Sequence, residues 1–169
     1  LVIEKNLQGA FMVPTEVLAE QHYKNLLKYL NPLLVSVELL TGNTPQKKRK
    51  EIFSNLNNGL VDILVGTHAL FEDKVIFNAL GMVVIDEQHR FGVTQRNRLL
   101  NKGENTNLLS MTATPIPRTL ALSIYGDLDV SQITELPPGR VPITTKIISE
   151  DDLTNLFKIV EDEINKGKQ

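Results

Sequence analysis

Short apolar runs alternate with helical patterns along most of this chain, and this alternation restricts the fold more than any other feature. Five runs of this kind occur, at residues 10–13, 34–39, 63–65, 82–85 and 108–110. Short, buried apolar runs separated by helical segments are typical of parallel strands joined by crossover helices. The sequence therefore predicts an α/β fold in which a mostly parallel sheet is flanked by helices.

The segments between the runs carry helix signals. Thr15 is a good N-cap for the first predicted helix, and Pro45 suits the first turn of the second. Ser149 and Asp152 have the spacing of a capping box at the start of the last one. The predicted helices cover residues 15–31, 44–57, 95–102 and 149–164, and residues 1–7 are expected to be the tail of another helix closed by Gly9.

Composition excludes several classes of protein. Of the 169 residues, 41% are hydrophobic and 22% are charged, which is typical of a globular domain rather than a disordered chain. No run approaches the roughly 18 apolar residues of a membrane span, so we expect a cytoplasmic protein without a membrane partner. The chain has no Cys, which excludes disulfides and cysteine-based zinc sites. Its net charge of −2 means that any contact with nucleic acid must come from a local patch.

A proline-rich segment divides the chain. Residues 137–142 hold three prolines and a glycine and are the predicted linker between a domain at 1–136 and the start of a second unit at 143–169. The apolar residues 143–148 predict a strand that opens this second unit. The chain begins with Leu1 instead of Met, so we expect it to be a piece of a longer protein.

Small, hydroxyl and charged residues follow every predicted strand. Ligands bind beyond the carboxyl ends of the strands in open parallel sheets, so these residues predict a functional edge. They are Pro14-Thr15-Glu16, Thr41-Gly42, Gly66-Thr67-His68, Asp86-Glu87-Gln88-His89 and Thr112-Ala113-Thr114.

The adjacent carboxylates of Asp86 and Glu87 carry the most chemistry. Two like charges this close repel each other by about 1 to 4 kcal/mol, depending on the local dielectric. In phosphoryl-transfer enzymes of the P-loop type, an Asp at such a strand end holds Mg²⁺. A neighbouring acid can orient or deprotonate the attacking water. The alternative is that Asp86 caps a turn and Glu87 is solvated, and the dipeptide alone does not decide between the two.

The order of these motifs resembles that of superfamily 2 helicases. Residues 14–16, 66–68, 86–89 and 112–114 are similar to motifs Ia, Ib, II and III of that superfamily. The longer strings resemble the RecG family of ATP-dependent DNA helicases, which remodel forks and Holliday junctions in recombination and repair. These strings are PTEVLAEQH (14–22), VGTHALF (65–71), VIDEQHRFGV (84–93), MTATPIPRTLAL (111–122) and GDLDVSQITELPPGR (126–140).

The resemblance implies a RecA-like motor lobe that uses ATP and Mg²⁺ and acts on branched or duplex DNA. It implies that Asp86 binds Mg²⁺ and that Glu87 activates water. Two further sets of roles follow by position: coupling of ATP to movement for Gln88, His89, Thr112, Ala113 and Thr114, and contact with the DNA backbone for Pro14, Thr15, Gly66, Thr67 and His68. Phosphate contacts of this kind position a protein without reading sequence. Capping of a helix remains an alternative role for Thr15, and the two are compatible.

The phosphate-binding loop of such motors does not occur in these 169 residues. A P-loop requires G-x-x-x-x-G-K-[ST], and the single Gly-Lys pair, at Gly167, is followed by Gln169 and preceded by Asp162 where the first glycine should stand. The resemblance places the P-loop upstream, on a strand expected beside the one that ends at Asp86. We therefore expect the isolated chain to be inactive and to have open strand edges. It should either self-associate through those edges or fill the place of the missing P-loop strand with residues 143–148.

Three questions stay open at this stage. A duplex DNA translocase of the transcription-repair coupling type shares the HRFGV and TATPIPRT strings, and a non-catalytic α/β binding module is an alternative from another class. The basic run at residues 47–50 either contacts phosphate or forms a solvated face. His22 and His68 lack metal-ligand spacing, so no zinc site is expected.

Overall fold

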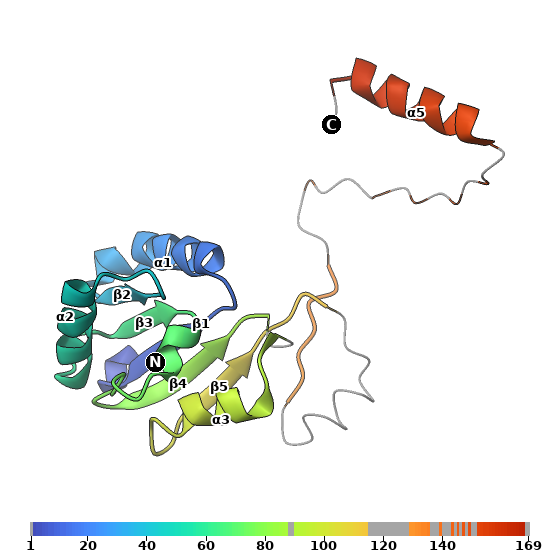
Figure 1. Ribbon diagram of the computed structural model, residues 1–169. Coiled ribbons are helices and arrows are strands. Elements are labelled where there is room, and N and C mark those ends of the chain that lie inside the picture. The colour runs from blue at the N-terminus through green and yellow to red at the C-terminus, as the bar shows by residue number, and fades with distance from the viewer. Residues whose placement is uncertain are drawn as a thin grey trace. The chain divides into compact units, whose positions relative to one another are not determined.

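The computed structural model describes residues 2–87, 90–114, 129–135, 139, 143, 145, 147, 149 and 152–167. Within these residues, five strands form one parallel sheet in the order β2-β3-β1-β4-β5 (Figure 1). Each predicted run overlaps one strand, which confirms the predicted α/β fold with its parallel sheet. The strands are β1 (Gln8–Met12), β2 (Val37–Leu40), β3 (Ile63–Gly66), β4 (Leu80–Ile85) and β5 (Asn107–Ser110).

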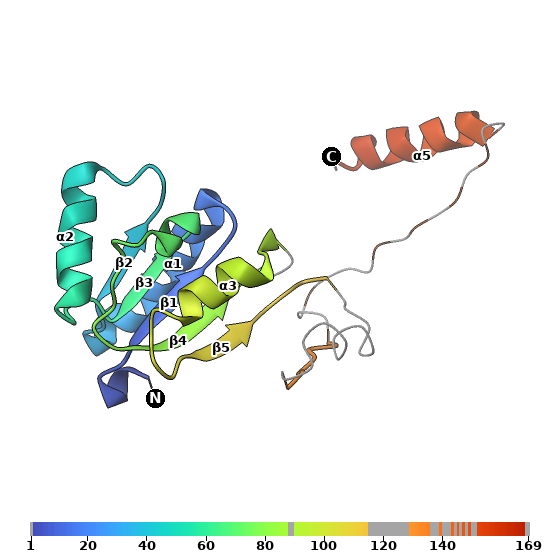
Figure 2. The same cartoon turned by 60° about the horizontal axis from the view of Figure 1, so that its bottom comes forward.

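Helices cover the sheet from both sides. The helix α1 (Glu16–Leu30) lies on one face, and α2 (Gln46–Asn57) and α3 (Val93–Leu100) lie on the other (Figures 1 and 2). Crossovers between parallel strands are right-handed, so the direction of each step along the sheet decides the face of its helix. The step from β1 to β2 runs opposite to the later steps, so α1 lies on the other face of the sheet from α2 and α3. Short 3-10 turns occur at Ile3–Lys5, Asn31–Leu33 and His68–Phe71.

Alternate strand residues feed two apolar cores. On the α2 and α3 face, strand residues such as Met12 and Ile85 pack with Ile52, Leu56 and Leu99 from the helices, all fully buried. On the α1 face, the core is smaller and is built from Val13, Ala19, Val37 and Val65 with partly buried residues of α1. Two buried faces explain why the strands are continuous apolar runs instead of alternating patterns.

A buried glutamine joins three segments at the amino-terminal end of the sheet. Gln8 Nε2 donates to the carbonyl oxygens of Leu56 at 2.9 Å and Val61 at 2.7 Å, and Gln8 Oε1 accepts from the backbone N–H of Ala79 at 3.0 Å. These three bonds satisfy the amide inside the core. They join the end of α2, the approach to β3 and the approach to β4.

Several helix boundaries differ from those predicted. Residues 3–5 form a 3-10 turn that Asn6 closes with φ 56°, and Gly9 belongs to β1, so the predicted helix tail over residues 1–7 is wrong. The helix α3 begins two residues early because the Gln95 side chain accepts from the backbone N–H of Gly92. The helix α5 (Leu153–Asn165) begins after Asp152, whose N–H bonds to the Ser149 carbonyl, so the predicted capping box is wrong.

The strand β4 has neighbours on both sides. It pairs with β1 over Met12↔Ile85 and with β5 over Ile85↔Ser110. The expectation that the P-loop strand lies beside β4 is therefore wrong for this sheet. Among the described residues, the open edges of the sheet are β2 and β5.

The chain divides into two compact units, Leu1–Leu120 and Ala121–Gln169. The first contains the whole sheet. The described helix of the second is α5, whose apolar residues Leu153, Phe157 and Ile164 are exposed. The predicted boundaries at 136 and 143 stay a prediction, and the predicted strand at 143–148 lies partly outside the described residues. No helix in the described ranges has the length and apolar character needed to cross a membrane.

Candidate functional site

The carboxyl ends of the five strands meet at one edge of the sheet. There the backbone N–H of Asp86 donates to Met12 O at 3.0 Å, and that of Val13 donates to Gly66 O at 3.0 Å. The N–H of Met111 donates to Ile85 O at 2.8 Å. The chain leaves β1 toward one face and β4 toward the other, which makes a topological switch point between them. The edge therefore carries most of the predicted site residues, at the place in the fold where open parallel sheets bind ligands.

Asp86 is held in place by a residue from α1. Its Oδ1 accepts from the backbone N–H of Glu87 at 2.9 Å, and its Oδ2 lies 3.1 Å from Nε2 of His22. The His22 ring packs on Phe11 with centroids 4.6 Å apart. A carboxylate only accepts, so Nε2 carries the proton in this contact. His22 thus fixes the position of one Asp86 oxygen, while the Asp86 side chain stays 23% exposed.

The sequence analysis did not assign His22 to this site. His22 was considered there only as a possible metal ligand, whereas in the structure it contacts the carboxylate of Asp86, 64 residues later in the chain. A signal was present, because His22 lies on the same helical face as Ala19 and Leu26, both of which pack toward the sheet.

Glu87 adopts a left-handed backbone with φ 53°. This conformation costs a non-glycine residue about 1–2 kcal/mol. Strain of this kind in non-glycine residues clusters at functional sites. The Glu87 side chain is half-buried beside Asp86. The predicted coupling residues Gln88 and His89 lie outside the described residues.

The residues at the end of β4 fit Mg²⁺ held together with a phosphate. Mg²⁺ prefers oxygen ligands and is commonly bound through one or two carboxylates plus substrate phosphates and waters. Asp86 supplies such a carboxylate in a half-buried place. Within the described ranges, no cluster of three or more His, Cys, Asp or Glu residues forms a metal cage. The described residues of the site therefore offer the kind of oxygen ligand that Mg²⁺ takes when a phosphate and waters complete its coordination.

The segment after β5 brings its hydroxyls to the same edge. Thr112 Oγ1 and Thr114 Oγ1 are 2.7 Å apart, and the backbone N–H of Thr114 donates to Thr112 Oγ1 at 3.2 Å. Ala113 between them is exposed. The hydroxyls thus form a small polar turn just after β5, the strand that pairs with β4.

The segment after β1 opens α1 as predicted. Thr15 has an extended backbone, and its Oγ1 accepts from the N–H of Leu18 at 3.3 Å, which confirms the predicted N-cap. Thr15 is exposed and Pro14 is half-buried. The exposed end of α1 offers the backbone N–H groups that attract anions.

The segment after β3 is mostly buried. A Cβ on Gly66 would lie 2.2 Å from the Leu40 carbonyl oxygen, so only glycine allows β2 and β3 to approach this closely. Thr67 is 1% exposed, and its hydroxyl has no hydrogen-bond partner among the described atoms. Of the three residues in this motif, only His68 is exposed.

The basic run at residues 47–50 contains side chains with different surroundings. Arg49 is buried, and Lys48 Nζ lies 2.8 Å from Glu38 Oε1. The hydrogen bond to Glu38 raises the pKa of Lys48, so this ammonium stays charged. Lys47 and Lys50 are exposed. The run is therefore neither a uniform phosphate-binding patch nor a uniform solvated face.

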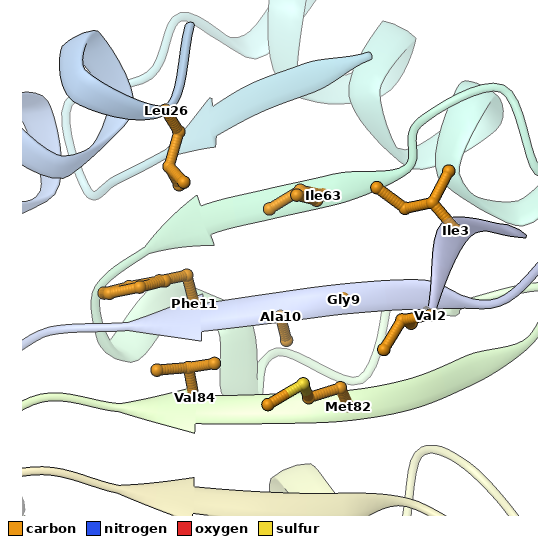
Figure 3. A pocket seen from close by; sticks show the side chains of 9 residues that line it. All are labelled: Val2, Ile3, Gly9, Ala10, Phe11, Leu26, Ile63, Met82 and Val84. Atoms are coloured by element: carbon orange, nitrogen blue, oxygen red, sulfur yellow. The ribbon is translucent and has the colours of Figure 1, made fainter. Parts of the chain in front are cut away.

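A hollow of about 270 Å³ lies on the α1 face of the sheet (Figure 3). All nine residues that line it are apolar or glycine: Val2, Ile3, Gly9, Ala10, Phe11, Leu26, Ile63, Met82 and Val84. It offers no polar group to a phosphate. It is therefore a gap in apolar packing and not the nucleotide site.

Comparison with known proteins gives a consistent result. Residues 2–122 match the DEAD/DEAH box helicase family. The chain is 54% identical to the ATP-dependent DNA helicase RecG of Synechocystis sp. over 99% of its length, and 52% identical to RecG of Bacillus subtilis over 96%. It spans 20% and 24% of these two proteins.

Solved structures agree with the fold. A structure of RecG bound to a three-way DNA junction matches 95% of this chain and 21% of its own, with a TM-score of 0.77 and 44% identity. The helicase MrfA bound to DNA and AMPPNP matches 96% of this chain and 26% of its own, with a TM-score of 0.66 and 16% identity, which supports the fold alone. With a family model matched over most of its length, this chain belongs to the DEAD/DEAH box helicases.

Proposed function

We propose that this chain is part of the motor of an ATP-dependent DNA helicase that remodels branched DNA, and that its strand-end edge carries the catalytic carboxylates. One observation carries the proposal. Asp86 and Glu87 end a buried strand at the switch point of a DEAD/DEAH box fold, and His22 fixes an Asp86 oxygen there. The similarity to RecG proteins, and to a RecG structure on a three-way junction, supports branched DNA as the substrate.

Each carboxylate has a separate role in this proposal. Asp86 holds Mg²⁺, which when bound neutralises charge on the nucleotide phosphates. Glu87 accepts a proton from the attacking water and orients it. Thr112 and Thr114 form the polar turn after β5, and we assign Gln88, His89 and the 112–114 turn to coupling between the nucleotide and the DNA. No G-x-x-x-x-G-K-[ST] occurs in the 169 residues, so another segment must supply the phosphate-binding loop.

DNA binds the same edge through its backbone in this proposal. Pro14, Thr15 and His68 reach the surface and contact phosphates, helped by the exposed N-terminus of α1. Gly66 and Thr67 are buried, and they give the β3 loop its shape. A net charge of −2 gives no general attraction for DNA, so these local contacts must position it.

The test uses a protein of the length of the RecG relatives that carries this sequence. Its ATP turnover is measured with a three-way junction and with a linear duplex of equal length. We expect stronger stimulation by the junction, and loss of turnover in Asp86→Asn but not in Asp73→Asn, an exposed carboxylate paired with Arg98. Equal stimulation by the linear duplex would instead indicate a duplex translocase, and no stimulation by either DNA would exclude a DNA motor.

A further inference from the structure

Arg49 lies in the basic run that the proposed function leaves unexplained. We propose that it is a positioning residue, which ties the loop after β2 to the segment after β3 and so presents the DNA-contacting edge as one preformed surface. The proposal rests on the proposed function for the identity of the ligand. The tie between the two segments is a property of the free protein.

The contacts of Arg49 reach both segments from the first turns of α2. Its Nη2 donates to the carbonyl oxygen of Thr41 at 2.6 Å and lies 3.4 Å from that of Gly42. Its Nη1 donates to Glu72 Oε1, just after the turn that contains His68. Arg49 is 8% exposed. The guanidinium therefore faces two strand-end segments and not solvent.

The position of this cation is costly without those acceptors. A positive charge in the first turns of a helix opposes the helix dipole, and burial removes it from water. Arginine stays charged in proteins, so its acceptors are required. Its planar fork offers donors to several acceptors at once, whereas a lysine ammonium is a single point charge. The bridge thus depends on arginine and not only on positive charge.

Two other side chains, those of Glu16 and Lys102, also bind the segments after β2 and β3. Glu16, at the start of α1, accepts from the backbone N–H of Asn43 at 3.3 Å and from its side-chain amide. Lys102 Nζ donates to the carbonyl oxygens of Glu72 and Val75, both at 2.8 Å. The segments after β1, β2 and β3 are therefore joined by side chains, with Arg49 in the middle.

Direct contact between Arg49 and a DNA phosphate is the competing explanation. It requires the guanidinium to leave Thr41 and Glu72 and to reach the surface. Lys50, in the same run, is already exposed and needs no such change. The two explanations differ in salt dependence, because only a phosphate contact releases counterions.

The experiment compares Arg49→Lys, which keeps the charge, and Arg49→Ala, which removes it, with two controls in a protein of RecG length that carries this sequence. Lys50→Ala removes an exposed cation of the same run, and Leu56→Ala weakens the buried side of α2 without removing a hydrogen bond to either segment. Hydrogen exchange of the DNA-free protein is followed over residues 41–44 and 68–73. Junction affinity is measured at several salt concentrations.

In Arg49→Lys we expect faster exchange in both segments and about tenfold weaker DNA binding, the equivalent of one charge-assisted hydrogen bond. In Arg49→Ala, which removes the positive charge, the slope of log affinity against log salt should stay at its wild-type value. Leu56→Ala should leave exchange in these segments and affinity close to wild type.

Unchanged exchange in Arg49→Lys would overturn the tie. A salt slope reduced by about 0.9 in Arg49→Ala, which removes the charge that lysine keeps, would also overturn the positioning role, because it would show that Arg49 itself neutralises a phosphate. The same losses in Leu56→Ala would assign the effect to general stability. If the wild-type protein binds no DNA, the proposed function fails, whereas the exchange result still decides the tie.

Discussion

At the scale of single residues, the contact between His22 and Asp86 connects the helix that follows β1 with the candidate metal ligand. Side chains that hydrogen-bond to a metal ligand and orient it typically raise the metal affinity by 10- to 100-fold. We therefore expect His22→Ala to raise the Mg²⁺ concentration for half-maximal ATP turnover by about that factor in a protein of RecG length. A magnesium titration of the turnover rate measures it.

Two further variants make this test specific. Asn keeps a side-chain donor, so His22→Asn should restore part of the lost magnesium affinity. Lys24→Ala removes an exposed side chain from the same helix and should change nothing. A lower maximal rate at an unchanged magnesium requirement would contradict the role assigned to His22.

At this scale, the features that depend on residues close together in the sequence were predictable. The Thr15 cap acts over three residues, and Asp86 directly follows its strand, so both were predictable. The burial of Thr67 and the role of His22 depend on contacts between distant strands and helices. A small residue in a surface loop and one pressed against the neighbouring strand look the same in a sequence, which is why Gly66 and Thr67 were grouped with the exposed His68.

At the scale of elements, Gly66 sets the approach of β3 to β2. A Cβ there would lie 2.1 Å from Leu70 Cδ1 and 2.2 Å from Leu40 O, and a backbone oxygen cannot move without breaking strand pairing. We expect Gly66→Ala to lower the free energy of unfolding by about 1–3 kcal/mol or more. Urea unfolding measures the loss.

Gly9 is the matched control for this change. It also lies in a central strand, but a Cβ there would meet nothing closer than 3.7 Å. Gly9→Ala should be neutral or stabilise the protein by about 0.5–1 kcal/mol, because glycine loses more backbone freedom on folding. Equal unfolding midpoints for the two variants would contradict the close approach at Gly66.

The start of a helix was predictable where a side chain caps it at the expected position. The helix α1 begins after Thr15 as predicted, because the hydroxyl accepts the expected backbone N–H. At α5 the N–H of Asp152 bonds to the Ser149 backbone carbonyl, which any residue could supply. The residue types at 149 and 152 therefore carried no information about where this helix begins.

At the scale of the whole molecule, the carboxylates of this chain lack a phosphate-binding partner. Asp86 and Glu87 cannot hold nucleotide phosphates against a metal without the amide cradle of a P-loop. We expect the isolated 169-residue chain to release no phosphate from ATP above the rate of its own Asp86→Asn variant, with or without DNA. DNA-stimulated release by the unmodified chain would contradict this expectation.

The edge at β5 predicts self-association of the same chain. Among the described residues β5 pairs only with β4, and Leu109 on it is 46% exposed. Open strand edges recruit other strands, so the mass measured by light scattering should rise with concentration. Leu109→Lys should reduce the rise, whereas Leu34→Lys, at a 94% exposed position outside the sheet, should not. A constant monomer mass at all concentrations would contradict this prediction.

The most direct test of the account is ATP turnover and nucleotide binding by Glu87→Gln in a protein of RecG length, beside Glu104→Gln at an exposed loop position. Glutamine keeps the shape of the side chain and leaves the Asp86 ligand in place, but it cannot accept a proton from water. The account predicts unchanged nucleotide affinity and a turnover rate lower by about 10²- to 10⁴-fold in Glu87→Gln alone. Loss of nucleotide affinity in step with the rate, or turnover equal to that of Glu104→Gln, would contradict it.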